Sequence, residues 1–290
     1  MKKTAFIYIV IAGIFWGSSG IFFNLLSPFG FTSLQMTAMR GVVAAISMSL
    51  YILITNRRLF RVSIKHLILF ALSGTSVFGT AALYYAAISA SSVSTAVILM
   101  YTAPVFVMIY SVLFLGEKIN TVKAISVVAV FAGCALVSGV IGGMQFSLLG
   151  VALGLGAGLA YSAYNIFTKV QMIKGASPMS ASLYSFIFMG AISLFFCEPL
   201  DFAEKAMKEP LVTIPLIIAI GVCTCVLPYF LYTLAMRRIP AGTAAAFGII
   251  EPMSATLFSV IFFGEQLGIT AIIGIILILG AIFFLGKSEG

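Results

Sequence analysis

Ten long apolar segments joined by short polar connections restrict what this sequence can fold into. An α-helix rises about 1.5 Å per residue, so about 20 apolar residues cross the ~30 Å hydrocarbon core of a bilayer. Segments of this length lie approximately at 5–26, 32–54, 67–88, 94–115, 122–141, 148–171, 179–197, 212–236, 243–263 and 269–286. We therefore predict an all-α integral membrane protein with ten transmembrane helices, numbered helix 1 to helix 10 in chain order.

The composition excludes a water-soluble globular protein. The chain is 62% hydrophobic and only 8% charged, whereas soluble domains average about 45–50% apolar and about 25% charged residues. So few polar residues cannot coat a surface exposed to water, and the short connections leave no room for a separate soluble domain. Lys2 and Lys3 precede an apolar run that is too long for a signal peptide, so we expect the first helix to be retained.

The distribution of Lys and Arg predicts the orientation of the chain. With the N-terminus inside, 13 of the 16 basic residues fall at the inner face, only Lys205 and Lys208 fall at the outer face, and Arg40 lies within helix 2. This excess predicts cytoplasmic termini in a multi-pass protein of the plasma membrane. The net charge of +8 is then a topology signal and a contact with anionic lipid, and no nucleic-acid partner is expected. The acidic outer segment 198–210 is predicted to be a solvated loop with a short surface helix.

A repeated segment divides the chain into two halves. Residues 83–117 match residues 231–265 without gaps, at an offset of 148, with 11 of 35 positions identical. The identical pairs include Tyr84 with Tyr232, Pro104 with Pro252, and Gly116-Glu117 with Gly264-Glu265. Because the offset spans five helices, an odd number, the second copy is inserted upside down. We predict two five-helix inverted-topology repeats, 1–145 and 146–290, within one compact membrane domain, an arrangement that secondary transporters use.

These residues resemble the EamA-type carriers of the drug/metabolite transporter (DMT) superfamily. The resemblance covers nearly the whole chain: ten apolar segments, two halves, the proline followed by Gly-Glu in helices 4 and 9, Trp16-Gly17 in helix 1 and Arg40 in helix 2. It implies export of amino acids or related small metabolites or drugs. It also implies a central cavity lined by helices 1, 3, 4, 6, 8 and 9, with helices 5 and 10 at the periphery. Substrate identity varies among such carriers and does not transfer.

Two ionisable residues, Arg40 and Glu251, lie deep within predicted helices. A charge at the centre of a membrane helix costs about 2.5–3.5 kcal/mol on insertion scales, so such residues usually face a cavity and have a function. The repeat duplicates scaffold residues but not these charges, since Ala103 stands at the position equivalent to Glu251. Burial favours the neutral form of a carboxyl group, which makes Glu251 a candidate proton-coupling site. The alternative is a static buried pair or, for Glu251, an interfacial position if the helix edges lie elsewhere.

Three prolines, Pro104 in helix 4, Pro228 in helix 8 and Pro252 in helix 9, lie inside predicted helices. Each removes a main-chain hydrogen bond and leaves a carbonyl free, which is tolerable beside protein or a wet cavity. We interpret them as helix breaks or hinges at the binding site, and the alternative is a static kink.

Polar and aromatic side chains at helical spacing predict the faces that line a cavity. The candidate substrate-binding residues are Trp16, Asn24, Arg40, Thr80, Tyr84, Tyr101, Tyr161, Asn165, Tyr229, Tyr232, Glu251 and Ser254. They predict a moderately polar cavity with aromatic walls for a small-molecule substrate. The alternative is hydrogen bonding and close packing between helices, which is the commoner role of such residues in bundles.

The sequence argues against an enzyme. Its four cysteines form no C-x-x-C motif, and with one histidine in the chain we expect neither a metal site nor a cofactor. The only aspartate, Asp201, lies in a loop, so an aspartyl dyad is impossible, and there is no H-E-x-x-H motif or P-loop.

These features together predict a secondary active transporter that works by alternating access, with proton-coupled antiport as its coupling mode. An uncoupled facilitator or channel, or a lipid scramblase, is the alternative. A monomer is expected, although Gly150, Gly154 and Gly158 offer either a dimerisation face or packing within the protomer. Glu117 and Glu265 end their helices at the membrane surfaces, where capping or loop contacts are the first interpretation and a gate contact the alternative.

Overall fold

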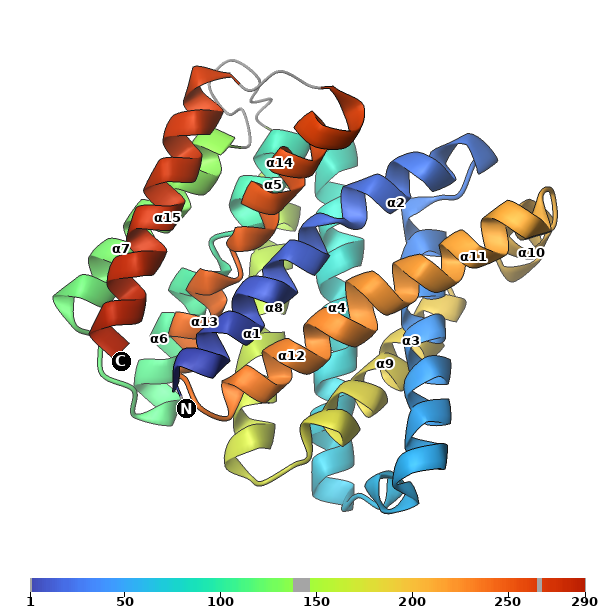
Figure 1. The fold of residues 1–290 in the computed structure, drawn as a ribbon, viewed down its shortest axis with the longest axis horizontal. Helices are drawn as coiled ribbons and strands as arrows, with labels where there is room; N and C mark the ends of the chain where they lie inside the picture. Colours follow the sequence, from blue (N-terminus) through green and yellow to red (C-terminus); the bar gives the residue numbers. More distant parts are fainter. Residues whose placement is uncertain (1, 138–146, 265–267, 290) are drawn as a thin grey trace.

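The computed structural model describes residues 2–137, 147–264 and 268–289, and this part of the chain is helical throughout its regular elements (Figure 1). The elements are α1 (Lys2–Gly17), α2 (Ser19–Leu26), η1 (Ser27–Phe29), α3 (Ser33–Thr55), η2 (Arg57–Phe60), α4 (Ile64–Ala90), α5 (Val93–Met100), α6 (Ala103–Leu115), α7 (Thr121–Val137), α8 (Leu148–Ile173), α9 (Pro178–Leu194), α10 (Pro199–Ala206), α11 (Pro210–Gly221), η3 (Val222–Val226), α12 (Leu227–Met236), α13 (Ala241–Phe247), α14 (Ile250–Phe263) and α15 (Ile269–Glu289). The predicted boundary between residues 145 and 146, and Glu265, lie outside the described residues.

Most of the predicted apolar segments are helices of membrane-spanning length. Within the described residues, seven are long and apolar enough to cross a bilayer: Lys3–Phe29, Ser33–Thr55, Ile64–Ala90, Thr95–Leu115, Leu148–Ile173, Pro210–Met236 and Ala241–Phe263. An eighth span is formed if α9 is counted with α10, to which it is bent by 101°, and α7 and α15 are shorter apolar helices. The all-helical multi-pass membrane fold is therefore confirmed, whereas the count of ten spans and the cytoplasmic termini stay predictions.

Two neighbouring helices, α7 and α15, form a pair at one edge of the molecule (Figure 1). Their backbones approach closely at Gly133 and Gly274, because a Cβ atom on Gly274 would lie 2.6 Å from the carbonyl oxygen of Gly133. This peripheral place is the one that the family resemblance implies for helices 5 and 10. On the other side of the bundle, α3 packs against α9 and α4 packs against α8.

Two of the long helices are broken at equivalent points of the repeat. One break, at Tyr101 and Thr102, separates α5 from α6, and the other, at Gly248 and Ile249, separates α13 from α14. Pro104 and Pro252 follow these breaks in the first turn of α6 and α14, where a missing N–H group is tolerated. The two broken segments run in opposite directions (Figure 1).

Two further irregularities distinguish the halves. Helix 1 breaks at Ser18, between α1 and α2, and the π-helix η3 precedes α12, in which Pro228 is the second residue. The prolines that the sequence marked as helix breaks therefore all stand just after an irregular segment.

The three glycines of α8 pack inside the protomer. A Cβ atom on Gly154 would lie 2.7 Å from the Cβ of Leu99, and one on Gly158 would lie 2.9 Å from the Leu99 carbonyl oxygen. A Cβ on Gly150 would lie 2.6 Å from the Cβ of Ser91. Because α5 occupies this face of α8, packing within the protomer is the alternative that the structure supports.

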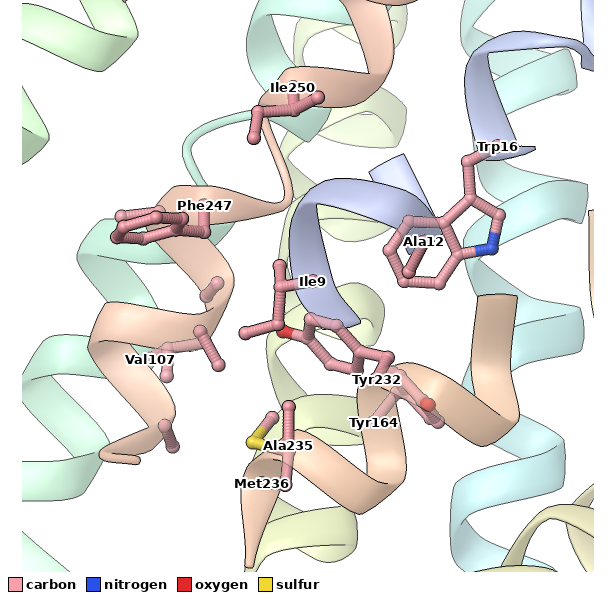
Figure 2. Packing of buried hydrophobic residues seen from close by; sticks show 14 of the residues in the cluster. Ile9, Ala12, Trp16, Val107, Tyr164, Tyr232, Ala235, Met236, Phe247 and Ile250 are labelled. Atoms are coloured by element: carbon pink, nitrogen blue, oxygen red, sulfur yellow. The ribbon is translucent and has the colours of Figure 1, made fainter. Parts of the chain in front are cut away.

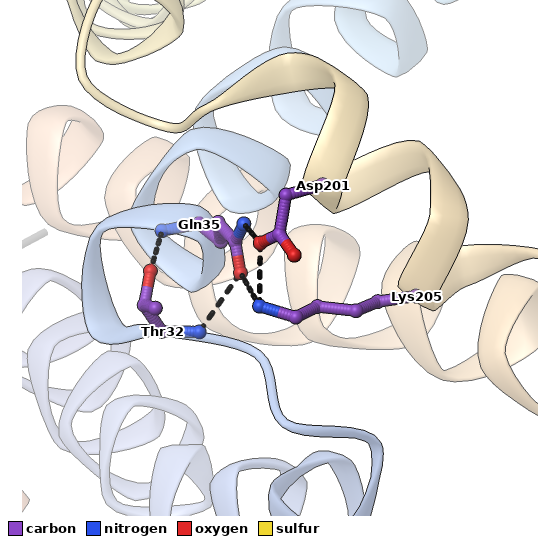
Figure 3. A network of polar contacts seen from close by, with 4 residues as sticks. All are labelled: Thr32, Gln35, Asp201 and Lys205. Carbon is purple, nitrogen blue, oxygen red and sulfur yellow. Dashed lines mark hydrogen bonds and ion pairs between the residues drawn. The ribbon is translucent and has the colours of Figure 1, made fainter.

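A polar network fixes the acidic segment 198–210 to the start of α3 (Figure 3). The Gln35 side-chain amide donates to the Asp201 carboxylate (2.6 Å), which also binds the Lys205 ammonium (2.5 Å). The Gln35 side-chain oxygen accepts from the Thr32 N–H, while the Thr32 hydroxyl accepts from the Gln35 N–H in a capping box. The bonds from Lys205 and then Gln35 hold the pKa of Asp201 below its usual value. The predicted short surface helix is α10.

Candidate functional site

A cavity of about 570 Å³ lies at the centre of the helical bundle. It is lined by side chains from α1, α2, α3, α4, α5, α8, α9, α12 and α14 and by Tyr101 at the break between α5 and α6. The shorter helices α7 and α15 contribute none of the lining residues. The helices that the family resemblance implies therefore all contribute, and Arg40 of helix 2 and Met189 of helix 7 add to them.

Most of the predicted substrate-binding residues line this cavity. These are Trp16, Arg40, Thr80, Tyr84, Tyr101, Tyr161, Tyr229 and Glu251, with the predicted break residue Pro252 beside them. They come from positions 16 to 252, so only the folded bundle brings them together.

Four predicted residues do not line the cavity, and each has a structural reason. Asn24 is exposed because the break at Ser18 ends the helical spacing that aligned it with Trp16. Asn165 and Tyr232 are fully buried, and the Tyr232 hydroxyl donates a hydrogen bond to the Asn165 side-chain oxygen.

Ser254 faces α1 instead of the cavity. A Cβ atom on Gly17 would lie 2.6 Å from the Cβ of Ser254, so the two helices touch at this point. The other two predicted break residues, Pro104 and Pro228, are buried and also lie outside the lining.

The cavity has two charged lining residues among those described, Arg40 and Glu251. Both side chains are partly accessible, and no ion pair within 4 Å joins them in the structure. The Arg40 guanidinium donates to the carbonyl oxygen of Thr224 (3.4 Å) in η3, the π-helix. A π-helix disturbs the regular hydrogen-bond ladder and often occurs at functional sites. Arg40 is therefore anchored at one side while its charge faces the cavity.

Glu251 stands in the first turn of α14, just after the helix break. Because Pro252 has no N–H, the carbonyl of Gly248 accepts a hydrogen bond from the Glu251 N–H (3.0 Å) instead. Tyr101, at the equivalent break of the other half, lines the same cavity as Glu251. The two breaks thus place an acid and a phenol together on the cavity wall.

Aromatic rings form the inner wall of the cavity. Trp16 meets Tyr229 edge to face, with ring centroids 5.1 Å apart, and lies 5.2 Å from the ring of Tyr232. Tyr164 and Phe186 pack against Tyr229 from behind, at 5.4 and 5.1 Å. Such contacts are favourable beyond the area that they bury, so this inner wall is well packed.

The cavity opens toward one end of the molecule. At this end its lining residues include Phe23 in α2, Ile88 near the end of α4 and the exposed Val93 at the start of α5. We call this end the open end. The opposite end, where α12 leads into α13, is called the closed end, because buried apolar residues fill it. Figure 2 shows Ile9, Val107, Tyr232, Met236 and Phe247 among them.

The sequence interpretation missed several lining residues, including Tyr85 and Met189. The face that α4 turns to the cavity follows the helical pattern i, i+3, i+4, i+7, i+8 and i+11: Val77, Thr80, Ala81, Tyr84, Tyr85 and Ile88. A search restricted to one polar stripe finds Thr80 and Tyr84 and omits their apolar and aromatic neighbours. Within the described residues, no group of three His, Cys, Asp or Glu residues could hold a metal ion.

The comparisons with known proteins agree with this architecture. A model described as the EamA-like transporter family matches residues 3–139 and again residues 148–287. An "uncharacterized transporter YwfM" of Bacillus subtilis is 26% identical over 94% of this chain and 90% of its own length. An "uncharacterized transporter" of Archaeoglobus fulgidus is 23% identical over 100% of both chains. A crystal structure of another protein shares the fold, with a TM-score of 0.83 at 14% identity over 100% of this chain and 98% of that one.

Proposed function

Because this chain belongs to the EamA-like transporter family, we propose that it is a secondary active transporter that exports amino acids or related small metabolites by alternating access. The observation that supports this most is the presence of Arg40 and Glu251 in one cavity whose other lining residues are mostly aromatic or apolar. One cation and one acid that are not paired with each other can bind the carboxylate and the ammonium group of a zwitterion. The aromatic rings offer contact area for an apolar side chain and for the ammonium group.

Proton coupling is proposed at Glu251. A carboxylate in a desolvated site is costly unless a cation or a proton neutralises it. The ammonium group of a substrate and a proton can therefore replace each other at the carboxylate, so that substrate leaves as a proton binds. Tyr101, which lines the same cavity, is proposed to donate a hydrogen bond to the charged form while neither is bound.

Alternating access is proposed to use the two broken helices. Helix breaks concentrate backbone change in a few residues, and the breaks at 101–102 and 248–249 lie beside the cavity in opposite halves. Two inverted halves can exchange their conformations and so expose one site to either side of the membrane in turn. We place the protein in the plasma membrane as a monomer with cytoplasmic termini, so that the open end of this structure faces outward.

The test is transport by the purified protein in proteoliposomes, with amino acids, amines and aromatic metabolites as substrates. Trp16 is the only tryptophan of the chain and lines the cavity, so its fluorescence reports binding without a transport assay. Saturable uptake that increases with an imposed pH gradient is expected for at least one zwitterion. Flux that does not saturate and ignores the gradient would instead indicate a facilitator or channel.

Glu251→Gln separates coupling from binding, because glutamine keeps the size of the side chain but cannot exchange a proton. We expect proton-driven uptake to fall at least tenfold, while substrate still quenches Trp16 fluorescence, with an affinity that is weaker without the carboxylate and no longer depends on pH. The matched control is Glu204→Gln on the surface helix α10, which lies far from the cavity in the fold. Unchanged proton coupling in Glu251→Gln would contradict the proposed role.

A further inference from the structure

A second charged cluster lies at the closed end, away from every residue proposed to contact substrate. The Glu117 carboxylate accepts a hydrogen bond from the Ala241 N–H (2.9 Å) and lies 3.5 Å from the Lys123 ammonium. The Lys123 side chain is only 2% exposed, and that of Glu117 is 14% exposed. Burying two charges costs several kcal/mol per ion unless they are paired and hydrogen-bonded, so this arrangement needs a reason beyond solubility.

Lys169 of α8 holds the neighbouring stretch of backbone. Its ammonium donates to the carbonyl oxygens of Met236 (3.0 Å) and Ile239 (2.6 Å), at the end of α12. Ala241, which donates to Glu117, is the first residue of α13. Lys169 therefore hydrogen-bonds the beginning of the α12–α13 connection, and Glu117 hydrogen-bonds its end.

The hydrogen bond from Ala241 to Glu117 joins the two halves of the chain. Glu117 and Lys123 come from the first half, and the α12–α13 connection belongs to the second. Gly242 makes the approach possible, because a Cβ atom there would lie 2.9 Å from Met108 Cγ and 3.4 Å from Lys123 Cε. Phe247 and Val107 belong to the apolar core that fills the closed end on the side toward the cavity (Figure 2).

We propose that Glu117, Lys123 and Lys169 form a latch that keeps the closed end shut while the cavity is open at the other end. This inference rests on the proposed alternating-access function. For substrate to leave at the closed end, α13 must separate from α6 and α7, and the bond from Ala241 to Glu117 must break. The latch residues are therefore functional residues of the transport cycle that never contact the substrate.

The test is reciprocal cysteine labelling in a background without the four native cysteines. Met108→Cys reports on the closed end, and Val97→Cys, in the cavity lining, reports on the open end. Each reporter is combined with Glu117→Ala and with Lys169→Met, and a membrane-impermeant maleimide is added from either side. Opening of the latch is expected to raise labelling at position 108 about tenfold and to lower labelling at position 97.

The reciprocal change distinguishes a latch from a contact that only stabilises the fold. Local unfolding would raise labelling at both positions, and that result would overturn the proposal, as would unchanged labelling at both. Lys118→Met, the exposed lysine next to Glu117, is the matched control and should change neither position. Labelling needs no substrate, so a reciprocal change can be observed even if no tested compound is transported. Transport without a reciprocal change would retain the proposed function and reject the latch.

Discussion

The two ends of the molecule each carry a network of an acid, a lysine and backbone or amide groups, but the networks differ in burial. At the closed end, the side chains of Lys123 and Glu117 are 2% and 14% exposed. At the open end, Lys205 and Asp201 are 16% and 41% exposed, and Lys205 follows Asp201 by one helical turn (Figure 3).

The difference in burial implies a difference in role. The exposed pair is screened by water and mainly orders α10 against Gln35 of α3. The buried pair is screened less, and its Glu117 also accepts the hydrogen bond from Ala241 of the other half, a bond that the proposed transport cycle must break. Leaving one partner of a buried charged contact unpaired is costly, so such a contact can favour one of two conformations. A screened contact only holds two elements together, and we call the contacts among Asp201, Lys205 and Gln35 the open-end clamp.

The largest expected effect comes from removing the Lys123 charge, which leaves the buried Glu117 carboxylate without its ion-pair partner. Lys123→Met keeps most of the length of the side chain but removes the ammonium partner of Glu117, and breaking a buried ion pair costs about 3–5 kcal/mol. We expect a clear fall in the melting temperature of the detergent-solubilised protein. Lys205→Met at the open end should change it little.

The double variant Lys123→Met with Glu117→Gln sharpens this prediction. Replacing both charges removes the uncompensated carboxylate, so the melting temperature should recover toward that of the unchanged protein. If Lys123→Met and Lys205→Met lower the melting temperature equally, burial does not distinguish the two networks.

The second effect concerns how tightly each end is packed. Gly242→Ala places a methyl group 2.9 Å from Met108 at the closed end, whereas a Cβ atom on Gly20, in the cavity lining near the open end, meets nothing within 4 Å. Overpacking of this kind costs about 1–3 kcal/mol. We expect Gly242→Ala to lower the melting temperature and Gly20→Ala to leave it unchanged. Equal changes in melting temperature would show that the closed end is packed no more tightly than the open cavity.

The sequence predicted the scaffold better than the contacts that close it. Hydropathy located the helices, since each must be about 20 apolar residues long, and the lone charges Arg40 and Glu251 identified the cavity. Helical spacing failed for Asn24, although Gly17-Ser18-Ser19-Gly20, at the break between α1 and α2, is a cluster of small residues that weakens a helix.

The latch was less accessible to sequence interpretation for a different physical reason. Glu117 lies at the end of its helix, where capping is the usual role, and its partner Ala241 is more than 100 residues away and contributes only a backbone N–H. No side-chain pattern can predict such a contact. The family resemblance supplied the carrier fold, but the closure of one end needed three-dimensional positions.

The smallest expected effect is the pH response of the open-end clamp. Bonds from Lys205 and Gln35 lower the pKa of Asp201 below its ordinary value of 3.8. A depressed pKa means that the clamp contributes fully above pH ~4 and weakens as the pH falls through the lower, folded-state value. We therefore expect no change between pH 7 and pH 5 and a loosening of α10 in more acidic solution. A spin label on Met207→Cys, at the exposed end of α10, should show greater mobility only in that acidic range.

Asp201→Asn should remove the pH response, and a label on Lys118→Cys at the closed end should stay unchanged while α10 loosens. A response at both labels would mean that acid loosens the whole bundle, and the clamp would then not be a separate element.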